Sequence, residues 1–131
     1  MHTYIIAEVG CNHNGDIEIA KEMTRQIAAA GCDAAKYQVF HASKLASRYA
    51  ESAEYQKKNL NNDDSQLEML ESLELSKDDY RELKELCDEL EIEFFATPFD
   101  SEAVEILEDL GVDRYKIGSG DVTDRLLLRK I

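Results

Sequence analysis

In Ala34-Ala35-Lys36-Tyr37-Gln38, and again in Tyr115-Lys116-Ile117-Gly118-Ser119-Gly120, one lysine lies near the end of a short apolar run, just before loop-like residues. Short apolar runs bounded by turn residues are typical of buried strands. Burying an ammonium group without a partner is costly, so a strand interior is a poor place for one. Two lysines at strand ends of one parallel sheet therefore indicate a shared anion-binding mouth.

Extended and helical patterns alternate along the rest of the chain. Strands are predicted at 4–7, 34–40, 92–96 and 114–117. Helices are predicted from the Asn14-Gly15-Asp16 break to Gly31, after the capping box at 76–79, and up to Gly111. A short helical stretch is expected near 67–73 and a last helix from 123, whereas 41–65 is a long polar connection.

This β-α-β order implies right-handed crossovers and a parallel α/β sheet of four strands. Two architectures fit, a doubly wound sheet and the N-terminal half of a (β/α)8 TIM barrel. A complete barrel takes roughly 250 residues, and the chain has 131. The barrel interpretation therefore places the other half of the barrel outside this sequence.

The length and composition predict a single domain with a hydrophobic core, since 44% of the 131 residues are hydrophobic. The net charge of −13 argues against nucleic acid and anionic membranes as partners. No apolar run approaches a membrane span, and no basic segment precedes the first strand, so neither an anchor nor a signal peptide is expected. The cysteines Cys11, Cys32 and Cys87 show no CxxC spacing, which predicts reduced thiols in a cytoplasmic protein.

Strand alternation brings further polar residues to the same mouth. If the faces that carry them point inward, six side chains converge at the C-terminal ends of the strands: Glu8, Lys36, Gln38, Thr97, Lys116 and Ser119. Parallel α/β folds bind their ligands at this edge. One carboxylate, two ammonium groups, two hydroxyls and an amide suit an anionic, oxygen-rich substrate.

Structural interpretations of the same residues stay open. Glu8 can be a plain ion-pair partner of a lysine, and Thr97 before Pro98 can be turn chemistry. Residues 118–120 can be a flexible turn. His13 can be a metal ligand or an acid–base group, although a loop residue that satisfies backbone groups is the simpler role. Metal-ligand spacings and nucleotide-binding fingerprints are both missing from the sequence.

Eight blocks in order resemble the N-terminal half of the sialic acid (N-acetylneuraminate) synthase family and its bacterial nonulosonate relatives. They are Ile6-Ala7-Glu8-Val9-Gly10, Asn12-His13-Asn14-Gly15, Ala35-Lys36-Tyr37-Gln38, Ala53-Glu54-Tyr55-Gln56, Ser65-Gln66-Leu67-Glu68-Met69-Leu70, Leu73-Glu74-Leu75-Ser76, Ala96-Thr97-Pro98-Phe99-Asp100 and Tyr115-Lys116-Ile117-Gly118-Ser119-Gly120-Asp121.

The resemblance implies a (β/α)8 barrel followed by a small antifreeze-like domain, of which residues 1–131 are a partial N-terminal piece. It implies condensation of phosphoenolpyruvate with an N-acylated amino sugar, such as N-acetylmannosamine, to a nonulosonic acid and phosphate. A divalent cation, Mn²⁺ or Mg²⁺, is implied as cofactor, with ligands expected beyond residue 131 and none in this chain. A homodimer is implied for the full-length protein.

The resemblance also implies roles for individual residues. Lys36, Thr97, Lys116 and Ser119 match phosphoenolpyruvate-binding positions, with Lys36 and Lys116 in the catalytic set. Glu8 matches an acidic residue at the amino sugar with a role in proton transfer. Gln38 and Asn61 match sugar-side positions, and Asp121 stands where many members carry glutamate.

Two other functions remain open on the sequence. A lysine on a barrel strand can be the nucleophile of a Schiff-base aldolase. A half-barrel with two open sheet edges can instead be a non-catalytic association module. The end at Ile131 falls in the apolar stretch Leu126-Leu127-Leu128, which predicts a truncated chain.

Overall fold

Three parallel strands form the centre of the fold. The computed structural model describes residues 2–46 and 66–131. Strands β1 (Ile6–Gly10), β2 (Ala34–Val39) and β3 (Glu93–Pro98) form one sheet in the order β1-β2-β3. Residues 34 to 39 of β2 pair in unbroken register with 93 to 98 of β3, so the C-terminal ends of these strands coincide.

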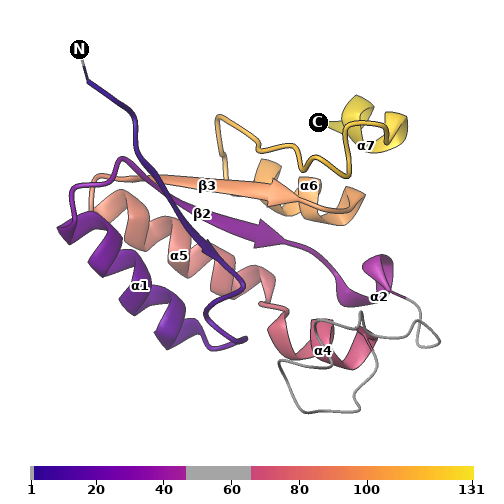
Figure 1. Cartoon of the computed structure of the whole chain (residues 1–131), viewed down its shortest axis with the longest axis horizontal. Helices are drawn as coiled ribbons and strands as arrows, with labels where there is room; N and C mark the ends of the chain where they lie inside the picture. The colour runs from indigo at the N-terminus through magenta and orange to yellow at the C-terminus, as the bar shows by residue number, and fades with distance from the viewer. Residues whose placement is uncertain (1, 47–65) are drawn as a thin grey trace.

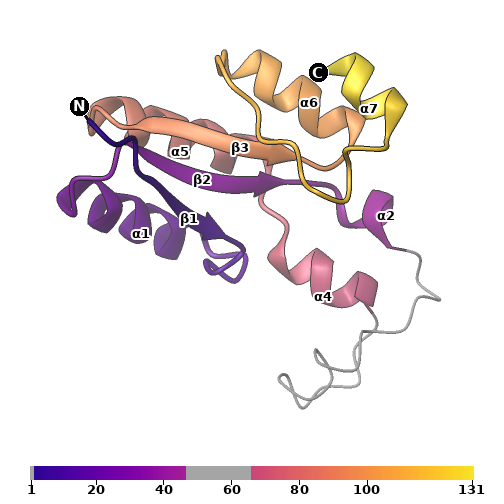
Figure 2. The same ribbon diagram turned by 45° about the horizontal axis from the view of Figure 1, so that its top comes forward.

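Helices α1 (Ile17–Ala29), α5 (Lys77–Glu89) and α6 (Ser101–Asp109) pack against the sheet (Figure 1). Helices α2 (Ala42–Leu45) and α4 (Gln66–Leu73) lie beyond the C-terminal end of β2, and α7 (Arg125–Lys130) lies beside α6 (Figure 2). Within the described ranges no helix is long and apolar enough to cross a membrane.

Each main helix begins where the sequence supplies a cap. Asp16 accepts hydrogen bonds from the first backbone N–H groups of α1, and Asp100 does the same for α6. Ser76 and Asp79 form the expected capping box of α5, which confirms that prediction. The chain turns out of α1 at Gly31 in the left-handed region, at φ 79°.

The core lies between the helices and one face of the sheet. That face carries Val9, Ala35, Tyr37, Phe94 and Ala96, all fully or nearly fully buried. The rings of Tyr37 and Phe94 stack with centroids 4.7 Å apart. Because side chains alternate along a strand, the polar residues between these positions lie on the opposite, inner face.

A chain of polar groups crosses this core. The Thr24 hydroxyl donates to the carbonyl of Ala20 and lies 2.5 Å from the hydroxyl of Tyr37, which is 3.8 Å from Sγ of Cys87. Buried polar groups need such partners. Burial raises the pKa of the Cys87 thiol to about 11 and raises the pKa of Tyr37 as well, so both stay protonated at neutral pH.

The α/β half-barrel class is confirmed, with corrections in detail. The fourth predicted strand, 114–117, is an isolated parallel bridge between Tyr115 and Ala96 in the described structure. The Lys116 N–H donates to the Ala96 carbonyl, and the chain then turns through Gly118, so a regular ladder does not develop. The first strand spans Ile6–Gly10 rather than 4–7, and the third strand ends at Pro98 rather than at 96. The predicted polar connection 41–65 contains α2 at its start.

The buried thiol predicts a loss of stability in alkaline solution. An unfolded cysteine ionises near pKa 9.0, whereas the folded pKa of Cys87 is about 11. The folded state holds this proton more tightly, so its contribution is complete below pH 9 and is lost between pH 9 and 11. The loss is about 2 kcal/mol by pH 11.

Cys87→Ala should therefore flatten the decline in the free energy of unfolding between pH 9 and 11, measured by denaturant titration. Cys32→Ala is the control for removal of a cysteine outside the core cluster. Identical slopes in Cys87→Ala and the unmodified protein would contradict the role given to the buried thiol.

Candidate active site

The candidate site lies on the inner face at the C-terminal ends of the strands. Two register pairs bring four predicted site residues together there: Glu8 lies opposite Lys36, and Gln38 lies opposite Thr97. Partners in a parallel pair share a face. The sheet therefore places a carboxylate, an ammonium, an amide and a hydroxyl on one face, as the sequence predicts.

An ion pair joins the first two of these residues. Nζ of Lys36 contacts Oε2 of Glu8, and the side chains are 15% and 48% exposed. Lys36 is thus largely withdrawn from water beside a carboxylate that remains half in solvent. The pair meets the requirement that a lysine on a strand has a partner.

Gly10 leaves room for the side chain of Glu8. A register irregularity separates Glu8 from Gly10, and Gly10 adopts φ 55°, in the left-handed region. A Cβ at Gly10 would lie 3.2 Å from Oε1 of Glu8 and 3.8 Å from Nε2 of Gln38. The glycine therefore lets both side chains lie against the backbone at the end of β1.

Cys11 and Thr97 complete this cluster. Sγ of Cys11 donates to Oε1 of Gln38 at 3.3 Å. Burial, and next the nearby Glu8 carboxylate, raise the pKa of the Cys11 thiol, which keeps it protonated as a donor. Thr97 is 2% exposed and lies at the end of β3, where Pro98 completes the pairing with Val39.

Lys116 shares the inner face without joining the cluster. The Tyr115 hydroxyl donates to Glu108 of α6 at 2.5 Å, so Tyr115 faces the helices and Lys116 faces the opposite way. Burial, followed by the Glu108 carboxylate, raises the pKa of Tyr115 to about 12. Lys116 is exposed, and its Nζ donates to the carbonyl of Ile117 at 2.6 Å.

The turn after Lys116 holds two further predicted residues. Ser119 is exposed. The carboxylate of Asp121 lies over Gly118, where a Cβ would collide with it, near the ring of Phe99. The structure thus brings Glu8, Lys36, Gln38 and Thr97 together. The other three predicted residues follow the bridge at the edge of β3 that faces away from β2: Lys116, Ser119 and Asp121. Asn61 lies outside the described residues.

His13 satisfies backbone groups, in agreement with the simpler of its predicted roles. It is 1% exposed, and its Nδ1 accepts a hydrogen bond from the N–H of Gly15 at 3.0 Å. Burial lowers the pKa of the imidazole against the opposing effect of a hydrogen bond to the Gly10 backbone. A neutral His13 therefore braces the β1–α1 loop from which Cys11 projects.

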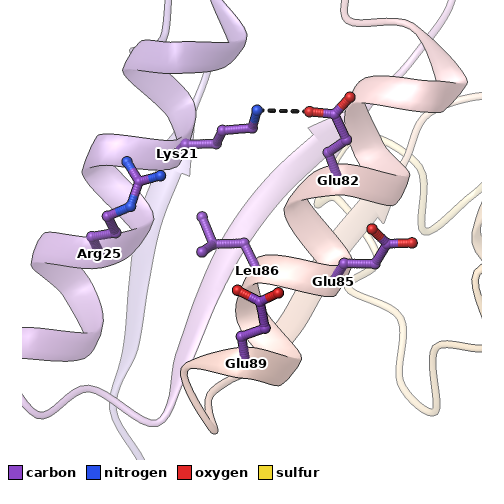
Figure 3. A pocket seen from close by; sticks show the side chains of 6 residues that line it. All are labelled: Lys21, Arg25, Glu82, Glu85, Leu86 and Glu89. Carbon is purple, nitrogen blue, oxygen red and sulfur yellow. Dashed lines mark ion pairs between the residues drawn. The ribbon is translucent and has the colours of Figure 1, made fainter.

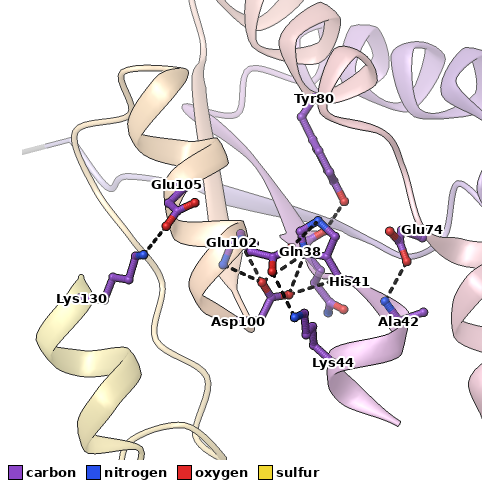
Figure 4. Close-up of polar contacts among 11 residues, drawn as sticks. Gln38, His41, Ala42, Lys44, Glu74, Tyr80, Asp100, Glu102, Glu105 and Lys130 are labelled. Carbon is purple, nitrogen blue, oxygen red and sulfur yellow. Dashed lines mark hydrogen bonds and ion pairs between the residues drawn. The ribbon is translucent and has the colours of Figure 1, made fainter. Parts of the chain in front are cut away.

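The sequence prediction missed a histidine–aspartate pair between two strand ends. Nδ1 of His41 lies 3.1 Å from both carboxylate oxygens of Asp100, which also accepts from the His41 N–H at 2.8 Å (Figure 4). Lys44 and Glu102 form an ion pair beside it. The available signal was position, since His41 and Asp100 follow strands that lie side by side. The pair ties the β2–α2 loop to the start of α6.

A surface cavity of about 470 Å³ lies elsewhere, between α1 and α5 (Figure 3). Lys21 reaches across it to Glu82 at 2.6 Å, and Glu85 and Glu89 lie along its α5 side. These helices cover the sheet face opposite to the inner one. The cavity is therefore separate from the candidate site.

The described residues do not form a metal site on their own. Across 2–46 and 66–131, no three His, Cys, Asp or Glu side chains gather closely enough to hold an ion. Single carboxylates and imidazoles do not make such a site. The described residues therefore do not supply a complete ligand set for the divalent cation that the resemblance implies.

Gly10→Ala tests the close packing around Glu8. The left-handed backbone costs an L-residue about 1–2 kcal/mol, and the new Cβ would press on Glu8. We expect the free energy of unfolding to fall by about that amount in denaturant titrations. Gly120→Ala is the matched control, because nothing lies within 4 Å of a Cβ there. Equal losses in the two variants would show that the Gly10 geometry is unimportant.

Comparison with known proteins identifies the family of this chain. Residues 23–131 match the NeuB family. The N,N'-diacetyllegionaminic acid synthase of Legionella pneumophila is 47% identical over 95% of this chain and 35% of its own length. The human N-acetylneuraminate-9-phosphate synthase is 39% identical over 97% of this chain and 35% of its length.

A solved structure agrees. The N-acetylneuraminic acid synthetase of Leptospira borgpetersenii, crystallised with citrate, superimposes with a TM-score of 0.79 at 29% identity, over 99% of this chain and 41% of that one. The chain spans about a third of the length of the curated relatives it matches. On the extent of the family match and of these identities, the chain belongs to the NeuB family.

Proposed function

We propose that residues 1–131 are the N-terminal part of the barrel of a nonulosonic acid synthase. The complete protein would condense phosphoenolpyruvate with an N-acylated amino sugar. The observation that carries the proposal is the Glu8–Lys36 pair beside Gln38 and Thr97, at the C-terminal strand ends of a NeuB-family chain. Relatives that share this part of the chain are named as synthases of legionaminic acid and neuraminate 9-phosphate.

The proposed reaction requires cationic side chains that bind phosphoenolpyruvate and an acidic side chain that holds or moves a proton at the sugar. The enol carbon of phosphoenolpyruvate forms a bond to the aldehyde carbon of the sugar, water adds at the adjacent carbon, and phosphate leaves. Lys36 and Lys116 would hold the phosphate and carboxylate of phosphoenolpyruvate, with Thr97 and Ser119 adding directed hydrogen bonds. Glu8 would hold or move a proton at the sugar, and Gln38 would contact the sugar.

The remaining parts of the proposal concern the complete protein. Mn²⁺ or Mg²⁺ would polarise the aldehyde oxygen when bound, with ligands expected beyond residue 131. Asn61 and Asp121 would add to substrate binding. The other barrel strands, an antifreeze-like domain, a homodimer and a cytoplasmic location are proposed with the same family assignment.

The ion pair of Lys36 favours this reaction over the Schiff-base alternative. Imine formation requires a free amine, whereas Nζ of Lys36 is held in an ion pair with the Glu8 carboxylate. Borohydride with pyruvate should therefore leave Lys36 of the complete protein unmodified. A trapped adduct on Lys36 would favour the aldolase instead.

The direct test is phosphate release from phosphoenolpyruvate by the complete protein. N-acetylmannosamine and a panel of other N-acyl amino sugars should be supplied in turn with Mn²⁺. We expect sugar-dependent release with at least one of them. Release with none of these sugars would overturn the proposal.

Lys116→Ala tests the role proposed for Lys116 in binding phosphoenolpyruvate. Losing one charged contact to the reacting anion should lower turnover on the order of 100-fold or more, while the thermal unfolding midpoint stays near its original value because Lys116 is exposed. Lys84→Ala is the matched control, since Lys84 pairs with Asp88 on the outer helix α5. Near-normal turnover in Lys116→Ala would remove this residue from the site.

A further inference from the structure

A buried tyrosine reaches from the helix layer to a residue of the candidate site. The hydroxyl of Tyr80, on α5, donates to the backbone carbonyl of Gln38 at 2.9 Å (Figure 4). Tyr80 is 1% exposed, and burial raises the pKa of its hydroxyl, which therefore stays protonated as a donor. The roles proposed above for the inner face leave this contact unexplained.

The end of β1 explains why the Gln38 carbonyl needs such a partner. Successive carbonyls along a strand point to opposite neighbours. The Val39 carbonyl accepts from Phe99, on the β3 side, so the Gln38 carbonyl points toward β1. There β1 ends at Gly10, and the N–H of Asn12 turns back to the Val9 carbonyl. The Tyr80 hydroxyl takes the place of the missing ladder donor.

A second contact holds the side chain of the same residue. Sγ of Cys11 donates to Oε1 of Gln38 at 3.3 Å, and Nε2 of Gln38 lies beside Gly10 on the side of Glu8. An amide nitrogen is favourable next to a carboxylate, whereas an amide oxygen is not. With Oε1 accepting from the thiol, Nε2 is the end of the amide that lies toward Glu8.

We propose that Tyr80 and Cys11 are positioning residues that clamp the main chain and the side chain of Gln38, so that its amide N–H groups meet an acceptor oxygen of the amino sugar. The inference rests on the proposed function for its ligand. Tyr80 acts through Gln38 and does not touch the substrate itself.

Tyr80→Phe in the complete protein tests the clamp, with Tyr37→Phe as the matched control. Tyr37 is the neighbour of Gln38 on β2 and is equally buried, but its hydroxyl bonds to Thr24 on the helix side. Both variants lose one buried hydroxyl and should lose stability. Only Tyr80→Phe should raise KM for the amino sugar, by about tenfold, the effect of one well-placed hydrogen bond.

KM for phosphoenolpyruvate and kcat should change less than about twofold in Tyr80→Phe, since the main-chain clamp is proposed to affect sugar binding. Cys11→Ala should raise the sugar KM, and Cys11→Ser should restore it, because serine keeps the donor. A sugar KM that is unchanged in Tyr80→Phe, or raised equally in Tyr37→Phe, would overturn the inference.

Thiol alkylation by iodoacetamide gives a readout that needs no turnover. Peptide mapping should show that Tyr80→Phe speeds alkylation of Cys11 several-fold, whereas Tyr37→Phe speeds that of Cys87, which lies against the Tyr37 hydroxyl. An unchanged Cys11 rate in Tyr80→Phe would overturn the clamp. Wild-type protein that releases no phosphate with any sugar would overturn the proposed function instead, and the alkylation result would still decide the clamp.

Discussion

The parallel pairing of β2 with both of its neighbours is the constraint on which the rest of the structure depends. Because β2 is central, its alternating side chains divide the molecule into a helix side and an inner side. Tyr37 and Val39 enter the core, while Lys36 and Gln38 face the other way. The register then decides which residues of β1 and β3 can meet them, and it selects Glu8 and Thr97.

Polar contacts on the two sides of the sheet have different consequences. On the helix side, Thr24, Tyr37 and Cys87 satisfy one another inside a packed core, where their hydrogen bonds fix a single arrangement. On the inner side, Glu8 and Lys36 satisfy one another while the carboxylate stays half exposed. The inner pair therefore has one partner open to solvent, whereas the core set is enclosed.

Lysines lie on the inner face of the sheet, and many acidic side chains lie on the outer helices. The net charge is −13, yet Lys36 and Lys116 both lie on the inner face. Acidic side chains gather on the outer helices, as along α5, where ion pairs with Lys84 and Lys21 offset part of them. The two lysines are thus basic groups on the inner face of an acidic chain, and Glu8 pairs with one of them.

Local signals in the sequence determined the main helices α1, α5 and α6, their caps and the presence of the three paired strands. Asp16, Ser76 and Asp100 act within a few residues of themselves. Strands β1 and β3, by contrast, run to Gly10 and Pro98, past their predicted ends at residues 7 and 96. Tertiary structure alone decided that segment 114–117 makes one bridge, and that His41 meets Asp100 and Tyr80 meets Gln38. The last two contacts join residues 59 and 42 positions apart in the sequence, and the bridge joins Tyr115 to Ala96 across the edge of β3. No local pattern encodes these contacts.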